Sequence, residues 1–182
     1  VSLYKGHVST NLQYLKNTVS NIYAALVATE KSVEAQYPDK KAILPAQITF
    51  LSSQEVLTMY PDKTPKEREN IIAKEYGAVF LYGIGGELSN GFTHDGRAAD
   101  YDDWHLNGDL LYYHEVLDIA LEISSMGIRV DENSLYNQLM FKDRLDDLKY
   151  EYHNLIMEQT LPLTIGGGIG QSRLCMLLLE KA

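Results

Sequence analysis

The sequence predicts an α+β fold, in which helices pack against an antiparallel β-sheet. Short apolar runs are joined by a connection of hairpin length, and such a connection favours antiparallel pairing of the strands. Stretches with the three- to four-residue apolar spacing of helices stand in blocks apart from the strand runs. A doubly wound protein would instead alternate one strand with one helix.

The first 60 residues predict a long helix, a short strand and a second helix. Apolar side chains recur at helical spacing over residues 11–36, as in a helix with one buried face. Residues 47–51 form a short apolar strand. Ser52 and Glu55 then make a capping box, which should begin a helix that runs through Tyr60.

A second capping box precedes the most apolar strand. Thr64 and Glu67 flank Pro65, which suits the first position of a helix. Gly77 supplies the residue of positive φ that ends this helix. Residues 78–84 are apolar on both alternating faces, as expected for a strand in the middle of a sheet.

The second half of the chain predicts a hairpin, two helices and a final strand and helix. Residues 109–113 and 116–123 read as strands with a tight connection between them. Apolar spacings predict helices over two stretches, residues 131–141 and 143–158. A strand that begins at Leu163 turns at a run of glycines into a helix over residues 171–181.

The composition is that of one globular domain over residues 1–182. Of these residues 45% are hydrophobic, enough for one core. The 16 basic and 25 acidic residues give a formal charge of −9, so we expect no nucleic-acid partner. The apolar runs are shorter than the roughly 20 residues that cross a bilayer. With one cysteine and no signal-peptide pattern, we expect a cytoplasmic protein that does not bind membranes.

The glycine-rich stretch 166–173 is a candidate nucleotide site. It lacks the lysine and Ser/Thr of a P-loop and does not match a dinucleotide fingerprint. Glycines let an adenine or a phosphate lie against the backbone, and Arg173 at the start of the next helix could bind phosphate oxygens. The alternative is a tight turn followed by a surface arginine, and the residues alone leave both open.

Two further groups carry possible chemistry. Asp109 and Glu122 fall on strands between apolar neighbours, so we expect them on the open face, where two carboxylates can hold Mg²⁺ beside ATP phosphates. The stretch from Arg97 to Trp104 offers an arginine for a carboxylate, acids for an ammonium group and aromatic walls, as an amino-acid site requires. The alternatives are solvent-facing strand residues and a polar surface loop.

Other reactive residue types are expected to be structural or to lie on the surface. The four histidines in question have no metal-ligand spacing with a cysteine; they are His94, His105, His114 and His153. Cys175 lies in an apolar helical run, so a packed thiol is expected rather than a nucleophile.

Several segments together resemble the ammonia-dependent asparagine synthetases, in order and nearly in spacing. These segments are residues 50–55, 60–61, 77–81, 83–86, 97–104, 106–109, 122–131 and 164–173. The likeness extends from about Leu15 to the end, and residues 1–14 match poorly. The resemblance implies the fold of a class II aminoacyl-tRNA synthetase core, most similar to those for aspartate and asparagine, and a homodimer.

The resemblance also implies a reaction and a site. ATP and Mg²⁺ would convert L-aspartate and ammonia into L-asparagine, AMP and pyrophosphate through a β-aspartyl-adenylate. The residues implied at ATP or AMP are Asp109, Glu122, Ile123, Ser124, Ser125, Gly166, Gly168 and Arg173, with Asp109 and Glu122 also at the metal. Arg97 and Asp102 would bind aspartate, Asp102 through the ammonium group. Arg173 and Asp102 would be catalytic, and free ammonia is the expected donor because Cys175 is a poor candidate for a glutamine-dependent nucleophile.

Two features depart from the family pattern. Family members have a longer N-terminal part, with an ATP-binding arginine and further aspartate-binding residues, so we expect this chain alone to be catalytically incomplete. Only His105 separates Trp104 from Leu106, where the family carries a longer loop.

Two other functions are compatible with parts of the sequence. An aminoacyl-tRNA synthetase core would share the adenylate step, but the acidic charge, the lack of a tRNA-binding extension and Gln171 beside Ser172 fit the amide-forming family better. A non-catalytic paralogue would lack half of the site, but the acids and Arg173 are retained.

Overall fold

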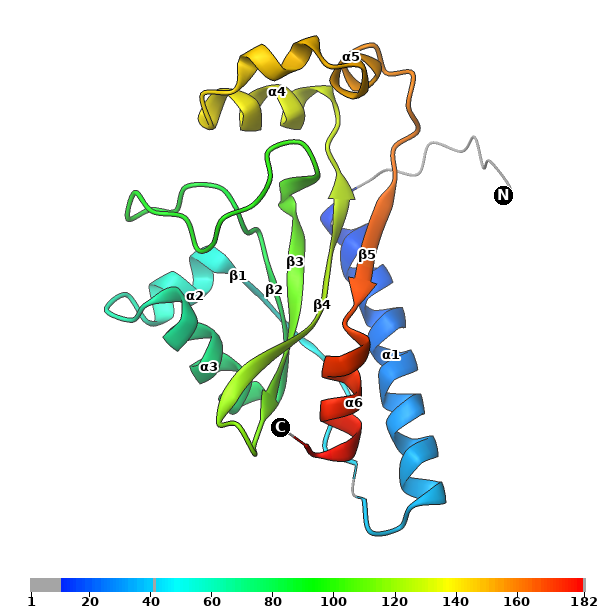
Figure 1. The fold of residues 1–182 in the computed structure, drawn as a ribbon. Helices are drawn as coiled ribbons and strands as arrows, with labels where there is room; N and C mark the ends of the chain where they lie inside the picture. Colours follow the sequence, from blue (N-terminus) through cyan, green and yellow to red (C-terminus); the bar gives the residue numbers. More distant parts are fainter. Residues whose placement is uncertain (1–10, 41, 182) are drawn as a thin grey trace.

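The computed structural model describes residues 11–40 and 42–181, which form one sheet with helices around it (Figure 1). In chain order the elements are α1 (Leu12–Gln36), β1 (Thr49–Ser52), α2 (Ser53–Met59), α3 (Pro65–Tyr76), β2 (Ala78–Tyr82), β3 (Asp102–His114), β4 (Ile119–Arg129), α4 (Glu132–Phe141), the 3-10 helix η1 (Leu145–Lys149), α5 (Glu151–Met157), β5 (Ile165–Ile169) and α6 (Gln171–Leu179). The predicted α+β class is confirmed.

The five strands lie in the order β1-β2-β3-β4-β5. Strands β2 to β5 pair antiparallel, as expected, but β1 and β2 are parallel, so the sheet is mixed rather than wholly antiparallel. The reason is that α2 and α3 fill the connection between β1 and β2, and parallel neighbours require such a crossover.

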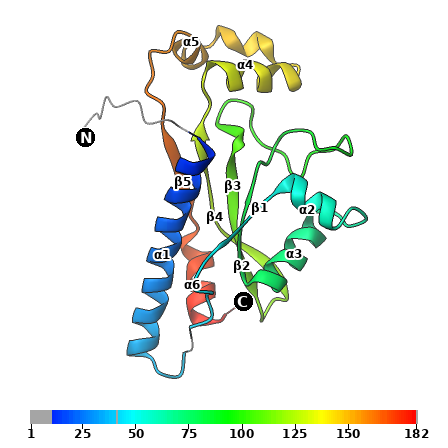
Figure 2. The same ribbon diagram turned by 180° about the vertical axis from the view of Figure 1, so that it is seen from behind.

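One face of the sheet is covered by α1 and α6, which lie side by side in both ribbon views (Figures 1 and 2). Leu15 and Val19 of α1 and Leu177 of α6 pack with Phe80 and Leu110 of the sheet in the largest core cluster. This packing explains the long apolar stripe of the first helix, since burial of such side chains stabilises each by about 1.5–3 kcal/mol.

The opposite face is covered at two places. Helices α2 and α3 pack over β1 to β3 through a cluster that includes Val56, Ile72 and Leu111. At the far end, α4 and α5 cap β3 and β4, where Leu135 packs in one cluster with Trp104 (Figure 1). Between these two coverings, β3, β4 and β5 present polar side chains and glycines, and the candidate site lies there.

The sequence prediction of helix starts and ends is confirmed in the first half of the chain. Both predicted capping boxes are present, with Glu55 bonded back to Ser52 and Glu67 to Thr64. Gly77 ends α3 at φ 75°. A Cβ there would also meet Pro45 at 2.8 Å, so a glycine is needed for space as well as for φ.

Several boundaries in the second half differ from the sequence prediction, and strand β4 spans Ile119–Arg129 rather than residues 116–123. The expected helix over residues 143–158 is two helices, because Tyr150 adopts an extended conformation (φ −76°, ψ 144°) between η1 and α5. Strand β3 begins at Asp102 instead of 109 and passes continuously through His105. The glycines at 166–168 belong to strand β5 rather than to a turn.

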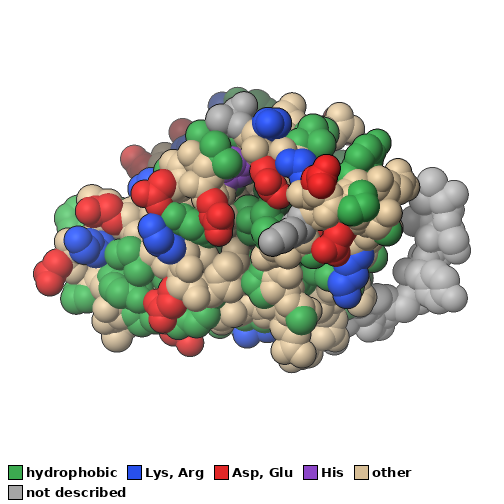
Figure 3. All heavy atoms as spheres, turned by 90° about the horizontal axis from the view of Figure 1, so that it is seen from below, with side chains coloured by type: hydrophobic (Ala, Val, Ile, Leu, Met, Phe, Trp, Pro, Cys, Tyr) green, Lys and Arg blue, Asp and Glu red, His purple; other side chains and the backbone are tan. Residues whose placement is uncertain are grey.

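The surface carries charges of both signs. Seen from below, acidic and basic side chains are interspersed with apolar ones (Figure 3). Within residues 11–40 and 42–181, helices that combine the length and the apolar character needed to cross a membrane are absent.

Candidate functional site

Strand pairing assembles the site from residues far apart in the sequence. Asp109 on β3 lies opposite Ser125 on β4, which lies opposite Gly168 on β5. Directly opposed residues point to the same face of a sheet, so these three form a row across it. The next row on the same face holds Gly127 and Gly166.

Two of the three glycines of β5, Gly166 and Gly168, form a flat floor on this face. A Cβ on Gly168 would meet nothing within 4 Å, so the space above it is open. A Cβ on Gly166 would overlap the guanidinium of Arg129, so that glycine makes room for an arginine. The two glycines lie in a strand rather than in a turn. The open space above Gly168 still leaves room for the predicted nucleotide.

Arg97 and Asp109 form an ion pair at one side of the floor. Arg97 also bonds Asp95, with 2.8 Å between Nη1 and Oδ2. Asp109 is buried, and its Oδ1 atom has no hydrogen-bond partner of normal geometry. Burial raises the pKa of the Asp109 carboxyl, and nearby Glu122 adds to the rise, while Arg97 and the Ser125 hydroxyl favour the ionised form. Asp109 is thus a buried carboxylate whose Oδ1 atom lacks a hydrogen-bond partner and whose negative charge is only partly offset by Arg97.

Asp102 and Arg129 form a second ion pair at the end of the strands. The two residues are register partners on β3 and β4. The Arg129 guanidinium stacks 3.9 Å from the centre of the Tyr101 ring and donates to the Tyr101 hydroxyl at 3.1 Å. Burial raises the pKa of Asp102, and Arg129 and then Arg97 oppose the rise. The positive charge of Arg97 lowers the pKa of both Asp102 and Asp109, so the two ion pairs lie close enough to influence each other.

Arg173 and Glu122 make the third charged pair. Arg173 is in the first turn of α6, and its Nη1 lies 3.2 Å from Glu122 Oε1 and donates to the Glu122 carbonyl at 2.9 Å. Both side chains are partly exposed, at 47% and 38%. Arg173 therefore reaches the open face, as the phosphate role requires, and is neutralised there by an acid of the same site.

Two predicted nucleotide residues have their side chains elsewhere. Ile123 is part of the core under α1 and α6. The buried Ser124 hydroxyl donates to the Gly168 carbonyl at 2.8 Å. The cause is a register shift in β4, where Leu110 pairs with Ser124 and Leu111 with Glu122, so that Ile123 is an extra residue of the bulge type. The side chains of Ile123 and Ser124 therefore lie beneath the candidate site, so the prediction that these residues line it concerns their backbone atoms.

Several residues at the site had no role predicted from the sequence. Arg129 is the most important of them, and Asp95 and Gly127 accompany it. A Cβ on Gly127 would lie 2.7 Å from Asp102 Cγ, so this glycine admits the Asp102 carboxylate. The signal was available in part, because Gly127 and Arg129 follow Ser125 at the two-residue period of one strand face.

The residues expected to be structural have mixed outcomes. His94, His114 and His153 are buried, and the side chain of His105 is 91% exposed, in line with the prediction of structural or surface roles. Cys175 is exposed, and the expectation of a packed thiol is wrong. The sheet-facing side of α6 is formed by Leu174 and Leu177, and Cys175 faces away from it.

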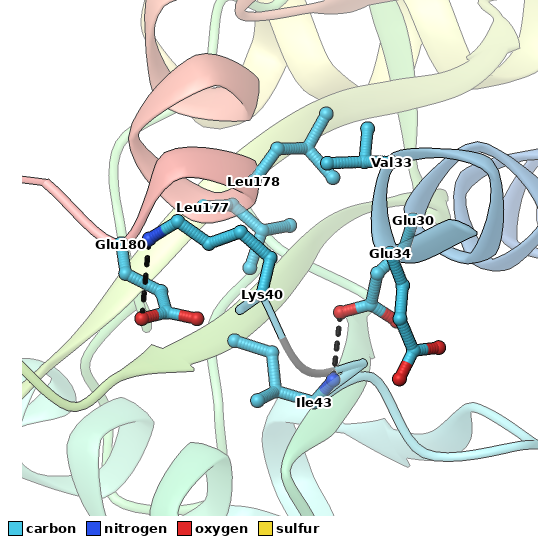
Figure 4. A pocket seen from close by; sticks show the side chains of 8 residues that line it. All are labelled: Glu30, Val33, Glu34, Lys40, Ile43, Leu177, Leu178 and Glu180. Atoms are coloured by element: carbon cyan, nitrogen blue, oxygen red, sulfur yellow. Dashed lines mark hydrogen bonds and ion pairs between the residues drawn. The ribbon is translucent and has the colours of Figure 1, made fainter. Parts of the chain in front are cut away.

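The hollows described in the structure lie away from these residues. One of about 270 Å³ is bordered by His114, Leu177 and Glu180 among others. A neighbouring one of about 10 Å³, beside the Lys40–Glu180 ion pair, has room for little more than one water (Figure 4). Neither is lined by a predicted site residue. The candidate site is an open face of the sheet, and we assign it by its charged pairs rather than by enclosure.

Comparison with solved structures shows the fold. Asparaginyl-tRNA synthetase from Pyrococcus horikoshii has a TM-score of 0.58 and 18% identity, over 94% of this chain and 44% of that one. Aspartyl-tRNA synthetase from Entamoeba histolytica has a TM-score of 0.57 and 16% identity, over 94% of this chain and 38% of that one. At such low identity the likeness concerns architecture alone, and it confirms the predicted class II synthetase-like core.

Comparison by sequence shows the family. An aspartate–ammonia ligase of Clostridium perfringens (strain 13 / Type A) is 55% identical over 172 residues, which cover 94% of this chain and 51% of the relative. One from Fusobacterium nucleatum is 53% identical over 171 residues, covering 94% and 52%. The chain thus spans about half the length of these curated relatives. The family model described as aspartate-ammonia ligase matches residues 6–182, and the chain accordingly belongs to the aspartate–ammonia ligase family.

Proposed function

We propose that the intact protein joins ammonia to the side-chain carboxylate of L-aspartate at the expense of ATP. The observation that carries this proposal is the pair of carboxylate–arginine contacts, the partly buried Asp102–Arg129 and the more deeply buried Asp109–Arg97, beside the open glycine floor. A substrate with two carboxylates and one ammonium group needs cations and an anion at close range, and these residues supply both. The family membership supports the same assignment.

The nucleotide would lie over β5 and the start of α6. Gly168 leaves room for a flat ring against the backbone. Arg173 would exchange its contact with Glu122 for phosphate oxygens, since a guanidinium binds phosphate with two parallel donors. Ser125, in the row between Asp109 and Gly168, would lie beneath the phosphates.

The residues present fit Mg²⁺ in part. Asp109 offers a buried oxygen without a hydrogen-bond partner. Glu122 is close enough for its negative charge to raise the pKa of Asp109. Among the described residues there is no group of three or more His, Cys, Asp or Glu that could hold a metal by themselves. Mg²⁺ would therefore take its remaining ligands from phosphate and water, which is its usual habit, and would neutralise phosphate charge there.

The proposed chemistry has two steps. A side-chain oxygen of aspartate attacks the α-phosphorus of ATP, the bond to pyrophosphate breaks, and a mixed anhydride with AMP forms. Ammonia then attacks the acyl carbon, AMP leaves with the bridging oxygen, and a proton passes to solvent to give asparagine. The protein's part is to hold two anions together and to neutralise their charge, through Arg97, Arg129 and Arg173.

The assignment of Asp102 follows from the same geometry. A partly buried carboxylate already paired with Arg129 can also accept the substrate ammonium, while the arginine meets a substrate carboxylate. We further propose, on the family resemblance, that the protein acts as a homodimer in the cytoplasm and takes free ammonia as donor. Because Cys175 is exposed, its burial no longer argues against glutamine, and the donor has to be tested.

The deciding experiment is product analysis of the intact protein with aspartate, ammonia, ATP and Mg²⁺. We expect asparagine, AMP and pyrophosphate in equal amounts. Release of ADP and phosphate would contradict the adenylate. Equal rates with glutamine in place of ammonia would overturn the donor assignment.

A further inference from the structure

Residues 94–101, here called the Arg97 segment, carry Arg97 toward Asp109 and lead into Asp102 at the start of β3. The segment contains neither helix nor strand. Among its backbone contacts, Val130 N donates to Tyr101 O at 3.1 Å. Most of its other connections come from side chains, so the position of Arg97 depends on what those side chains hold.

The first end of the segment is held by α3. His94 Nε2 lies 3.1 Å from Glu69 Oε1, and the two side chains are only 1% and 13% exposed. Burial works to raise the pKa of Glu69, but hydrogen bonds from His94 and Lys66 outweigh it and hold that pKa below its ordinary value. His94 is directly followed by Asp95, which bonds Arg97.

The other end is held by α5. His153 Nε2 lies 3.1 Å from Asp100 Oδ2, with the histidine side chain 6% exposed. Asp100 is two residues before Asp102. This contact joins the helical cap of α4 and α5 to the segment, and it uses the same pairing of histidine and carboxylate as the first end.

The middle is held through the backbone. The Gln138 side-chain amide donates to the carbonyls of Ala99 at 2.9 Å and Asp102 at 3.1 Å. The indole of Trp104 donates to the Ala98 carbonyl at 3.0 Å. With both histidine pairs in place, three helices and a strand fix a stretch that has no regular structure of its own.

The two histidines are bonded in the same way. Nδ1 is buried without a partner in His94 and in His153, and Nε2 faces the carboxylate. A bare lone pair at Nδ1 is tolerated better than a buried N–H without an acceptor, so the fitting tautomer carries its proton on Nε2 and donates it. Each ring thus donates one hydrogen bond, from Nε2, at a distance from the backbone that the rigid imidazole sets.

We propose that His94 and His153 are positioning residues, whose Nε2 hydrogen bonds to Glu69 and Asp100 fix the two ends of the Arg97 segment and so aim Arg97 and Asp102 at the site. Neither ring belongs to the charged pairs of the site; each acts through the carboxylate it holds. The catalytic consequence rests on the proposed function, but the restraint on the segment does not.

The test compares glutamine and asparagine at each histidine in the intact protein. The side-chain nitrogen of Gln reaches the place of Nε2, whereas that of Asn reaches only the place of Nδ1, so the two variants differ in the reach of one donor. His105→Asn is the matched control, because His105 is exposed and lies on β3 close to the same segment. Steady-state kinetics and amide hydrogen exchange of residues 95–102 are measured on each.

We expect His94→Asn and His153→Asn to lower kcat by about tenfold or more, as loss of a group that orients a ligand-binding residue does. The KM for ATP should stay within about twofold, and exchange should rise over residues 95–102 but not in β2 or α1. The Gln variants should restore both readouts, and His105→Asn should change neither.

Equal behaviour of the Gln and Asn variants would overturn the proposal, and so would unchanged exchange in the Asn variants. Exchange that rises throughout the chain, or an Asn variant that does not fold, would assign the histidines to global stability instead. If the unaltered protein made no asparagine, the proposed function would fail, while the exchange measurement would still decide the restraint.

Discussion

The guanidinium of Arg129 occupies the space above Gly166 in which any other residue would carry its Cβ. The same guanidinium pairs with Asp102 and stacks on Tyr101. One glycine of the floor therefore belongs to the amino-acid side of the site. Gly168, two residues on, opens onto free space on the nucleotide side.

Alanine at these two glycines should separate the two sides. In Gly166→Ala the new methyl group displaces Arg129, so aspartate affinity should fall by about tenfold or more, as for a disturbed buried ion pair. In Gly168→Ala the methyl group fits the free protein but occupies the floor, so ATP affinity should fall with thermal stability unchanged or slightly raised. Calorimetric titration of each ligand into the intact protein measures both. The same loss of both ligands in each variant would contradict the division of the floor.

Asp102→Asn should weaken aspartate binding by about 2–5 kcal/mol, because the substrate ammonium loses a partly buried carboxylate partner while the shape of the site is kept. ATP affinity should change little, since Arg173 and Gly168 lie on the other side. Asp103→Asn is the control, as Asp103 accepts from the His105 backbone at 2.8 Å and takes no part in the charged pairs of the site. A loss of both ligands after Asp102→Asn would mean that the substitution acts through the fold.

Asp109→Asn should separate stability from activity. The pKa of Asp109 is raised in the folded state, so the ionised side chain lowers the free energy of unfolding at pH values above that raised pKa. The variant should therefore be as stable as the parent protein, or more stable, at pH 7. The difference should vanish as the pH falls below the ordinary value of 3.8, where the parent carboxyl is protonated in both states.

The same variant should lose about 100-fold or more in kcat, since a carboxylate proposed to hold Mg²⁺ is gone. Thermal unfolding across this pH range, together with kinetics in excess Mg²⁺, makes the comparison. A variant that is much less stable at pH 7 would show that the Arg97–Asp109 pair stabilises the fold, in spite of the burial of Asp109.

Arg173→Ala should cost about 2–4 kcal/mol in the transition state and little in folding, because the side chain is half exposed and its present partner is another residue of the site. Arg144→Ala provides the control, since Arg144 makes a comparable exposed ion pair with Asp147 away from the glycine floor. Equal turnover in both variants would leave Arg173 as an ordinary surface residue.

Local chemistry explains what the sequence could predict of the fold. The start of α3 is specified within four residues by Thr64, Pro65 and Glu67, so no distant contact was needed to place it. The break at Tyr150 was not predictable in this way, because the leucine spacing continues across it. After the break, α5 presents His153 to Asp100, a contact that spans 53 positions in the chain.

The site shows the same division. Asp109 and Glu122 stood out because acids are rare among apolar strand neighbours. Their partners could not be predicted from the spacing of residues along the chain. Arg97 meets Asp109, and Arg173 at the start of α6 meets Glu122, only once the chain has folded. Arg129 was missed although it stood within a recognised segment, because its importance comes from the space left by Gly127 and Gly166 rather than from its own neighbours.

The extra residue at Ile123 sets the parity of strand β4. Residues 122 and 125 are an odd number of positions apart, so in a regular strand Glu122 and Ser125 would point to opposite faces. The shift in pairing between Leu110 and Leu111 restores them to one face, and Gly127 and Arg129 follow Ser125. Deleting Ile123 would remove the bulge and place Glu122 two positions before Ser125, so a regular strand would still keep Glu122, Ser125 and Arg129 on one face. The chemistry of this face therefore depends on parity: loss of a single residue between Ser125 and Arg129, where the strand is regular, should send Glu122 to one side of the sheet and Arg129 to the other.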